Sequence, residues 1–502
     1  MDRKRNYGVL MPISCLPSKE GIGTMGDEAF KFVDFLSRSG AEVWQVLPLN
    51  PTNYGDSPYQ SCCSDALNYY FIDLSFLVKD GLLKAEEVEG TQLKRIDRRV
   101  DYGLQFTNKI ELLRKAFSRF DRSNKDFKEF IRDGKYSDFA TFMALKCKFG
   151  HKPWEEWDEP YRTFDKSITD KYIADNFNEF EFWQFTQFIF LLQWDALKNY
   201  AHAHGISIMG DIPLYLAYDS VEMWKYGDKL FKVDKFRRPQ CVAGVPPDAF
   251  TDDGQLWGNP VYDWEKMKST GYEWWNGRID GSLSLFDILR IDHFRGFDRY
   301  YEVPVGETTA RNGKWSDGPK EDLFSDKLHY NIVAEDLGVI DDGVRRLMKN
   351  VGYPGMKILE FAFDGYCENE HKPSTYRSDN WVVYTGTHDN MPLRQYIDDL
   401  TGHWLEVFKR DLKNECREQG FEAQTETSKD MCLSIVELAF RSKAKTVIIP
   451  LWDLLAMGGE ARMNLPSTVS DRNWSWRFVD GEISDGCAQY LKDIAEKSNR
   501  IN

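Results

Sequence analysis

The run Leu289-Arg290-Ile291-Asp292-His293-Phe294-Arg295-Gly296 places an arginine, an aspartate and a histidine at the end of a largely apolar segment. A buried strand does not normally carry such residues unless partners neutralise their charges. At the C-terminal end of a strand in a parallel barrel, however, this is where catalytic groups are found. The run therefore predicts a barrel strand over residues 285–291 that ends at an active site.

Two other apolar segments end in the same way. Residues 331–334 lead into Glu335, and residues 381–384 lead into Thr385-Gly386-Thr387-His388-Asp389-Asn390. Because the C-terminal ends of parallel strands meet at one rim of a barrel, we expect Asp292, Glu335 and Asp389 to share one acidic pocket. Structural salt bridges are the alternative interpretation of each of these carboxylates.

The order of the predicted elements favours an α/β fold, a (β/α)8 TIM barrel without a separate C-terminal β domain. A helix is expected over residues 28–37, and a long helix over residues 180–204. The predicted strands cover residues 41–47, 206–211, 285–291, 331–335, 356–362, 381–386 and 446–451. A doubly wound sheet gives a similar alternation, but no Gly-rich phosphate loop follows the first strand.

Two insertions are expected within a single catalytic domain over residues 1–502. Strand signals vanish from about residue 80 to 200, where apolar residues recur at helical spacing, so this segment is predicted to be mainly helical. Residues 215–282 show weak periodicity and form a second insertion. Long loops of this kind usually serve as lids or binding loops, and the candidate lid is the loop 244–260.

Composition excludes several classes of function. The formal charge of −15 argues against a nucleic-acid partner, because phosphate binding needs a basic field. No apolar stretch approaches the length of a membrane span, and no export signal is evident. The nine cysteines lack metal-ligand spacing, which favours reduced thiols and a cytoplasmic protein. Aromatics make up 15% of the chain, and they are either core residues or platforms for sugar rings.

Two carboxyl groups on either side of a glycosidic bond are sufficient to cleave it, and Asp292 and Glu335 are the natural pair. Arg290 lies two residues before Asp292 and so points to the same side of an ideal strand. Its charge is expected to lower the pKa of Asp292, which suits a nucleophile. Glu335 follows an apolar run, where burial is expected to raise its pKa, which suits a general acid.

Metal-assisted hydrolysis is the chief rival chemistry. His293 beside Asp292 and His388 beside Asp389 have the residue types of metal ligands. The first strand does not end in His-x-His, however, and no His-rich cluster occurs in the chain. We therefore expect no metal and no other cofactor at this site.

Taken together, these motifs resemble those of the 4-α-glucanotransferases, or amylomaltases, of glycoside hydrolase family 77. The resemblance spans nearly the whole chain. Besides the three strand-end motifs, it rests on Trp44-Gln45-Val46-Leu47-Pro48-Leu49, Asp56-Ser57-Pro58-Tyr59-Gln60, Gly210-Asp211-Ile212-Pro213, Gly244-Val245-Pro246-Pro247-Asp248, Trp257-Gly258-Asn259-Pro260, Arg462-Met463-Asn464-Leu465-Pro466 and Asn473-Trp474-Ser475-Trp476-Arg477.

The resemblance implies transfer of α-1,4-glucan segments between maltooligosaccharides or starch-type glucans, through a covalent glucosyl-enzyme. It assigns the nucleophile to Asp292, the acid/base to Glu335 and the third carboxylate, which stabilises the transition state, to Asp389. The implied substrate-binding residues are Tyr59, Asp211, Arg290, His293, His388, Asp248, Trp257, Asn464, Ser57 and, for a second glucan site, Tyr54. An α-glucan hydrolase on the same barrel and a non-catalytic glucan-binding protein are the alternatives.

Overall fold

Eight parallel strands form the barrel in the computed structural model, which describes residues 5–247, 252–338 and 340–501. The strands are β1 (Asn6–Leu10), β2 (Val43–Gln45), β3 (Ser207–Ile212), β6 (Ile288–Ile291), β9 (Ile332–Ala334), β10 (Gly355–Ile358), β11 (Trp381–Tyr384) and β12 (Thr446–Pro450). They are hydrogen-bonded in the order β10-β11-β12-β1-β2-β3-β6-β9. A hydrogen bond of 2.9 Å from Ala334 N to Pro354 O links the two ends of this sheet. The predicted (β/α)8 barrel is confirmed.

The barrel explains the short apolar runs of the sequence. Strand residues such as Val9, Ile208, Leu289 and Val383 are fully buried, as expected for parallel strands that are covered on both faces. The outer layer consists of helices α1 (Asp27–Ser39), α13 (Glu273–Leu285), α14 (Asp342–Val351), α15 (Leu393–Asp399), α16 (Gly402–Glu418), α17 (Ser428–Arg441), α18 (Leu451–Leu454) and α19 (Asp485–Lys497).

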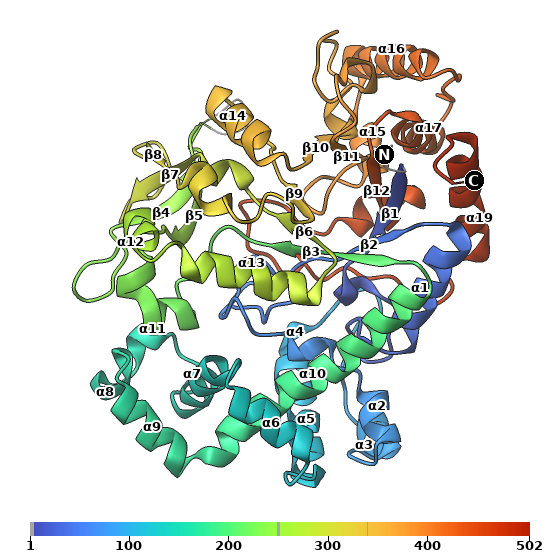
Figure 1. Ribbon diagram of the computed structural model, residues 1–502. Coiled ribbons are helices and arrows are strands. Elements are labelled where there is room, and N and C mark those ends of the chain that lie inside the picture. Colours follow the sequence, from blue (N-terminus) through green and yellow to red (C-terminus); the bar gives the residue numbers. More distant parts are fainter. Residues whose placement is uncertain (1–4, 248–251, 339, 502) are drawn as a thin grey trace.

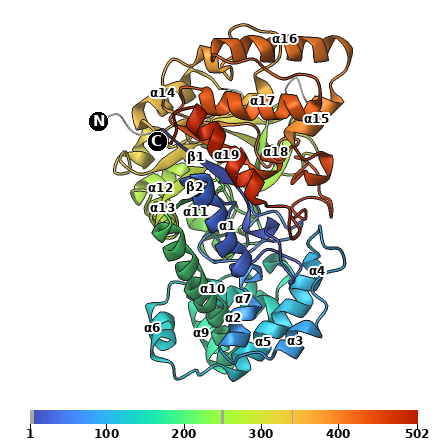
Figure 2. The same cartoon turned by 90° about the vertical axis from the view of Figure 1, so that its right-hand side faces the viewer.

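The first insertion, over residues 80–200, consists mainly of helices. Figure 1 shows it below the barrel, and Figure 2 shows the same arrangement from the side. It contains α2 (Leu74–Lys79), α3 (Ala85–Glu89), α4 (Tyr102–Leu104), α5 (Ile110–Arg119), α6 (Lys125–Asp133), α7 (Ser137–Lys148), α8 (Glu159–Arg162), α9 (Lys166–Asp175) and α10 (Phe177–Ala203). Helix α10 carries the chain back to the barrel, and its buried Phe182 and Phe185 pack in the core.

The second insertion contains strands that the sequence analysis did not predict. Helix α11 (Val221–Leu230) is followed by β4 (Cys241–Val245) and β5 (Gln255–Pro260), and then by α12 (Trp264–Ser269). Strands β4 and β5 pair with β7 (Arg299–Pro304) and β8 (Lys314–Asp317) in an antiparallel sheet of order β5-β4-β7-β8. Residues 244–245 and 255–260 of the segment predicted as a loop are therefore paired strands of a sheet beside the barrel.

Two predicted strand boundaries were also wrong. Helix α13 continues to Leu285, so the barrel strand begins only at Ile288 rather than at residue 285. Strand β10 ends at Ile358, and residues 359–361 form a 3-10 helix, although the sequence predicted a strand to residue 362. This turn places Glu360 beyond the end of the strand.

Candidate active site

A buried arginine lies between two aspartates at the C-terminal ends of two adjacent strands. Strands β3 and β6 pair in parallel, with Asp211 beside Arg290. One guanidinium nitrogen of Arg290 lies 2.6 Å from Asp211 Oδ2, and the other lies 3.1 Å from Asp292 Oδ1. Asp211 and Arg290 are buried, whereas the Asp292 side chain remains 27% exposed. The acidic group that faces solvent here is therefore Asp292.

Glu335 is held by backbone N–H groups. Its Oε2 accepts a hydrogen bond of 2.6 Å from His293 N, and its Oε1 accepts one of 2.8 Å from Leu337 N. His293 has φ 49°, a left-handed conformation that non-glycine residues rarely adopt. Backbone strain of this kind is common at functional sites. Because the donating N–H belongs to the residue after Asp292, the turn places the Glu335 carboxyl next to that aspartate.

The pKa values of the two carboxyl groups are separated. Burial and the nearby Asp292 charge raise the pKa of Glu335 to about 8. Burial also raises the pKa of Asp292, and the charges of Asp211 and Asp389 raise it further. Together they outweigh the lowering effect of Arg290 and bring this pKa to about 6. Arg290 does lower the pKa of Asp292, as predicted, but the net shift is upward because burial and the other carboxylates outweigh it. The pKa of Glu335 is therefore the higher of the two, so Asp292 loses its proton first and Glu335 keeps its proton to the higher pH.

Asp389 is the third carboxylate of the site, and its environment is different. Its Oδ1 accepts a hydrogen bond of 2.7 Å from Asn464 Nδ2, and its Oδ2 lies 3.4 Å from His388 Nε2. Burial alone would raise its pKa, but the His388 charge and these hydrogen bonds lower it to about 2. Asp389 is therefore ionised throughout the neutral range.

Aromatic rings join these groups into one wall. The rings of Tyr59 and His388 stack with centroids 4.9 Å apart, and Trp474 contacts both rings. The Tyr59 hydroxyl donates a hydrogen bond of 2.7 Å to Asp211 Oδ2. Trp474 was not among the predicted site residues, although it lies in a motif that carried the family resemblance.

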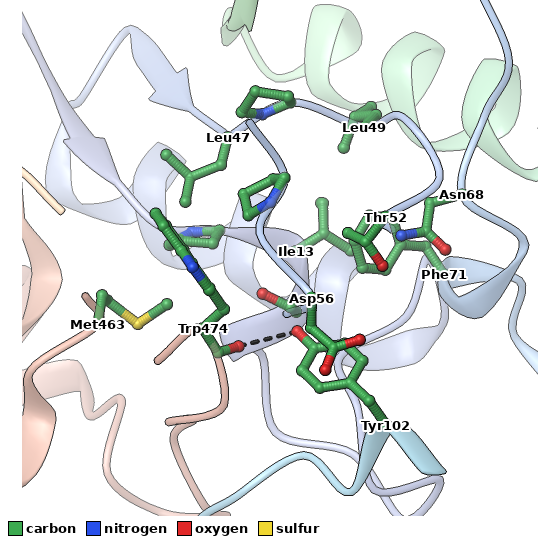
Figure 3. A pocket seen from close by; sticks show the side chains of 14 residues that line it. Ile13, Leu47, Leu49, Thr52, Asp56, Asn68, Phe71, Tyr102, Met463 and Trp474 are labelled. Atoms are coloured by element: carbon green, nitrogen blue, oxygen red, sulfur yellow. Dashed lines mark hydrogen bonds between the residues drawn. The ribbon is translucent and has the colours of Figure 1, made fainter. Parts of the chain in front are cut away.

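Figure 3 shows Trp474 at the edge of a small pocket, where its carbonyl oxygen accepts a hydrogen bond of 2.8 Å from the Tyr102 hydroxyl. The pocket beside it, lined by Leu47, Asp56 and Met463 among others, has a volume of about 20 Å³. That is room for about one water molecule and too little for a sugar ring.

The hairpin of β4 and β5 reaches the same site. Trp257 on β5 makes an edge-on contact with the His293 ring, with centroids 4.8 Å apart. Tyr215, which sequence reasoning missed, contacts both rings. Asn259 and Gln60 exchange two side-chain hydrogen bonds of 3.0 and 3.1 Å, which tie β5 to the Tyr59 loop.

The remaining predicted residues are placed less centrally. The Ser57 hydroxyl accepts a hydrogen bond of 3.2 Å from Tyr59 N and so shapes that loop. Tyr54 is 90% exposed and lies on the surface, apart from the catalytic group. Asp248 lies outside the described residues. Within those residues, no group of three His, Cys, Asp or Glu side chains has a metal-binding arrangement.

Comparison with known proteins identifies the family. A family model described as 4-alpha-glucanotransferase, of glycoside hydrolase family 77, matches residues 11–481. The chain belongs to the 4-alpha-glucanotransferase family. It is an enzyme of the amylomaltase type, and enzymes of this family act on α-glucans.

Relatives of this glucanotransferase match along its whole length. The 4-alpha-glucanotransferase of Clostridium butyricum is 41% identical over 488 residues, which cover 96% of this chain and 98% of the relative. That of Aquifex aeolicus is 42% identical, over 95% of this chain and 96% of the relative. The amylomaltase of Streptococcus agalactiae, solved in complex with acarbose, superposes with a TM-score of 0.93 at 36% identity, over 99% of this chain and 100% of that one.

All nine cysteines of this glucanotransferase are free thiols in the structure. None of the helices in residues 5–247, 252–338 and 340–501 is long and apolar enough to cross a membrane.

The raised pKa of Glu335 predicts a pH-dependent effect on stability. An unfolded glutamate has a pKa of about 4.3, whereas the pKa of folded Glu335 is raised to about 8. Between these values the folded state holds a proton that the unfolded state has lost, so stability falls with rising pH, by at most ~1.4 kcal/mol per pH unit. Glu335→Gln removes this pH-dependent loss. The free energy of unfolding of the variant minus that of the wild type should therefore increase as pH rises from about 5 to about 8.

Urea unfolding of both proteins across this pH range measures the difference. Glu368→Gln, at an exposed position, is the matched control and should follow the wild type at every pH. If the free energies of unfolding of Glu335→Gln and the wild type change with pH in the same way, the raised pKa of Glu335 is contradicted.

Proposed function

We propose that the enzyme transfers α-1,4-glucan segments from a donor maltooligosaccharide or starch-type glucan to the 4-hydroxyl of an acceptor, with retention of configuration. The observation that carries this proposal is the placement of two carboxyl groups side by side, because Glu335 Oε2 accepts a hydrogen bond of 2.6 Å from His293 N, the residue after Asp292. Burial and the Asp292 charge raise the pKa of Glu335 above that of Asp292, so Glu335 keeps its proton to the higher pH. A retaining glycosidase mechanism needs this combination, with the two carboxyls about 5–5.5 Å apart.

In the first step, a carboxylate oxygen of Asp292 attacks the anomeric carbon of the donor. The glycosidic bond breaks as Glu335 gives its proton to the leaving oxygen, and a covalent glucosyl-enzyme forms. Arg290 favours the ionised form of the attacking carboxylate by its contact of 3.1 Å with Asp292. The hydrogen bonds from His293 N and Leu337 N fix the orientation of the acid.

In the second step, ionised Glu335 takes the proton from the 4-hydroxyl of the acceptor. The acceptor oxygen attacks the anomeric carbon, and Asp292 leaves as a carboxylate. The oxocarbenium-like charge of both transition states is stabilised by the neighbouring carboxylates. Asp389, with its pKa lowered to about 2, supplies a permanent negative charge and accepts hydrogen bonds from sugar hydroxyls.

The aromatic side chains supply contacts for the glucan. Tyr59 and His388 on one side, and Trp257 with His293 on the other, present ring faces and polar atoms of the kind that bind sugars. Asp211 and Asn464 hold Tyr59 and Asp389 in place. Ser57 shapes the Tyr59 loop by accepting the hydrogen bond from Tyr59 N. The exposed Tyr54 is assigned to a second glucan-binding site, and Asp248 to a contact with the glucan.

Transfer must compete with water, which is present at about 55 M, so an acceptor has to be held with a high effective concentration. The β4–β5 hairpin carries Trp257 to the site and is tied to the Tyr59 loop by Asn259 and Gln60. We assign to this hairpin the exclusion of water from the glucosyl-enzyme.

Incubation of the purified enzyme with maltotriose tests the proposed reaction. Transfer should give glucose together with a ladder of longer maltooligosaccharides, while the number of reducing ends stays nearly constant. Chromatography and a reducing-end assay measure the two. Glucose and maltose with rising reducing ends would instead make the protein a hydrolase, and an unchanged substrate would favour a glucan-binding protein.

The role of Glu335 as an acid predicts a dependence on the leaving group. Glu335→Gln should lower kcat on maltotriose by ~10²–10⁴-fold, as for loss of general acid catalysis. On α-glucosyl fluoride, whose leaving group needs no proton, the same variant should release a rapid burst of fluoride. Asp292→Asn is the matched control and should show no burst. If Glu335→Gln loses as much rate on α-glucosyl fluoride as on maltotriose, the assignment of Glu335 as the general acid is contradicted.

A further inference from the structure

The segment that carries His388 and Asp389 is anchored from beneath by a buried carboxylate. Asp453, on α18 after β12, is fully buried. Its Oδ2 accepts a hydrogen bond of 2.6 Å from the Thr385 hydroxyl, and its Oδ1 accepts one of 2.8 Å from Leu393 N. A single side chain therefore fixes both ends of the segment 385–393.

A second buried carboxyl group holds the middle of the same segment. Asn390 Nδ2 donates a hydrogen bond of 3.1 Å to Glu360 Oε1. Asn390 Oδ1 in turn accepts bonds of 2.9 Å from both the backbone N–H and the hydroxyl of Thr387. The Thr387 hydroxyl also accepts a bond of 3.3 Å from Asp389 N. A chain of hydrogen bonds thus runs from Glu360 to the backbone on either side of His388.

The state of Glu360 suits a fixed anchor. The residue is only 6% exposed, and its Oε2 is buried with no hydrogen-bond partner among the residues that the structure describes. Burial raises its pKa to about 8, assisted by the Asp453 charge and opposed by Asn390 and Arg462. Near neutral pH the carboxyl is therefore protonated, and a glutamine matches it in shape and charge.

The backbone leaves little freedom around this anchor. Oε2 of Glu360 and Oδ2 of Asp453 lie 3.5 and 3.6 Å from the position that a Cβ would occupy on Gly386. Backbone atoms also tie the two strand ends, because Glu360 N donates a hydrogen bond of 3.0 Å to Thr385 O. The two carboxyl groups thus lie beside Gly386, at the start of the segment 385–393, and Asn390 accepts the hydrogen bonds from Thr387 that complete the turn.

We propose that Glu360 is a positioning residue, which acts through Asn390 to fix the turn that presents His388 and Asp389 to the substrate. This inference rests on the proposed role of Asp389. Neither Glu360 nor Asn390 is assigned a contact with the sugar. A misplacement of about 1 Å in a catalytic group can cost ~10²-fold in rate, so loss of the anchor should appear mainly in kcat.

Four variants test the inference, with kcat and KM measured on maltotriose and the melting temperature measured for each protein. Glu360→Leu and Asn390→Ala should each lower kcat by ~10–100-fold with a smaller change in KM. Glu360→Gln keeps the acceptor oxygen for Asn390 and should retain most of the activity. The double variant Glu360→Leu with Asn390→Ala should be no slower than Asn390→Ala alone, because both changes break one chain of contacts.

Asn390→Ala is the less disruptive change and keeps the test valid if Glu360→Leu does not fold. Glu222→Gln is the matched control, because Glu222 is equally buried and accepts hydrogen bonds from Ser64, which is not among the predicted site residues. It should leave kcat unchanged. The inference would be overturned if Glu360→Leu folds and keeps the wild-type kcat, or if Glu360→Gln is as slow as Glu360→Leu. It would also be overturned if the fold-losses of the two single variants multiply in the double variant.

Asp389→Asn separates failure of the inference from failure of the proposed function. If Asp389→Asn is inactive while Glu360→Leu and Asn390→Ala are fully active, only the positioning role is wrong. If Asp389→Asn is itself active, the proposed role of Asp389 in transition-state stabilisation is wrong, and the inference that Glu360 positions Asp389 for catalysis is overturned too.

Discussion

The site depends on the two ion pairs that the buried guanidinium of Arg290 makes with Asp211 and Asp292. The barrel brings the acidic ends of β3 and β6 together, with Asp211 and Asp292 on either side of one cation. Without a positive charge between them, the desolvated carboxylates would repel one another and take up protons. Arg290 therefore permits an ionised Asp292 beside a protonated Glu335, and the chemistry of the site follows from that difference.

The rest of the rim is built so that each carboxyl group has a distinct environment. Glu335 accepts hydrogen bonds from the backbone N–H groups of His293 and Leu337, Asp389 faces a histidine and an amide, and Glu360 and Asp453 lie underneath as anchors. Similar residue types thus have different protonation states because their surroundings differ. The four-stranded sheet adds to the barrel the hairpin that carries Trp257 to His293.

Much of this arrangement could be predicted from the sequence, because it is encoded locally. Apolar runs that end in Asp292, Glu335 and Asp389 identify strands and catalytic ends at once, and the helical insertion shows in its periodicity. The four-stranded sheet was missed because β4 and β5 are only partly buried and alternate weakly. The net direction of the Asp292 pKa shift was not predicted, because it depends on burial in the folded chain and on the charges of Asp211 and Asp389, which are distant in sequence. Trp474 and Glu360 also act through tertiary contacts that no local pattern reveals.

The central claim is that Asp292 becomes covalently glucosylated while Glu335 handles the protons. The most direct measurement is mass spectrometry of Glu335→Gln after brief exposure to α-glucosyl fluoride, followed by peptide mapping. The account predicts one added glucosyl group on the peptide that contains Asp292, because the variant forms the intermediate but lacks the base that releases it. A glucosyl group on another residue, or continued turnover without any adduct, would contradict it.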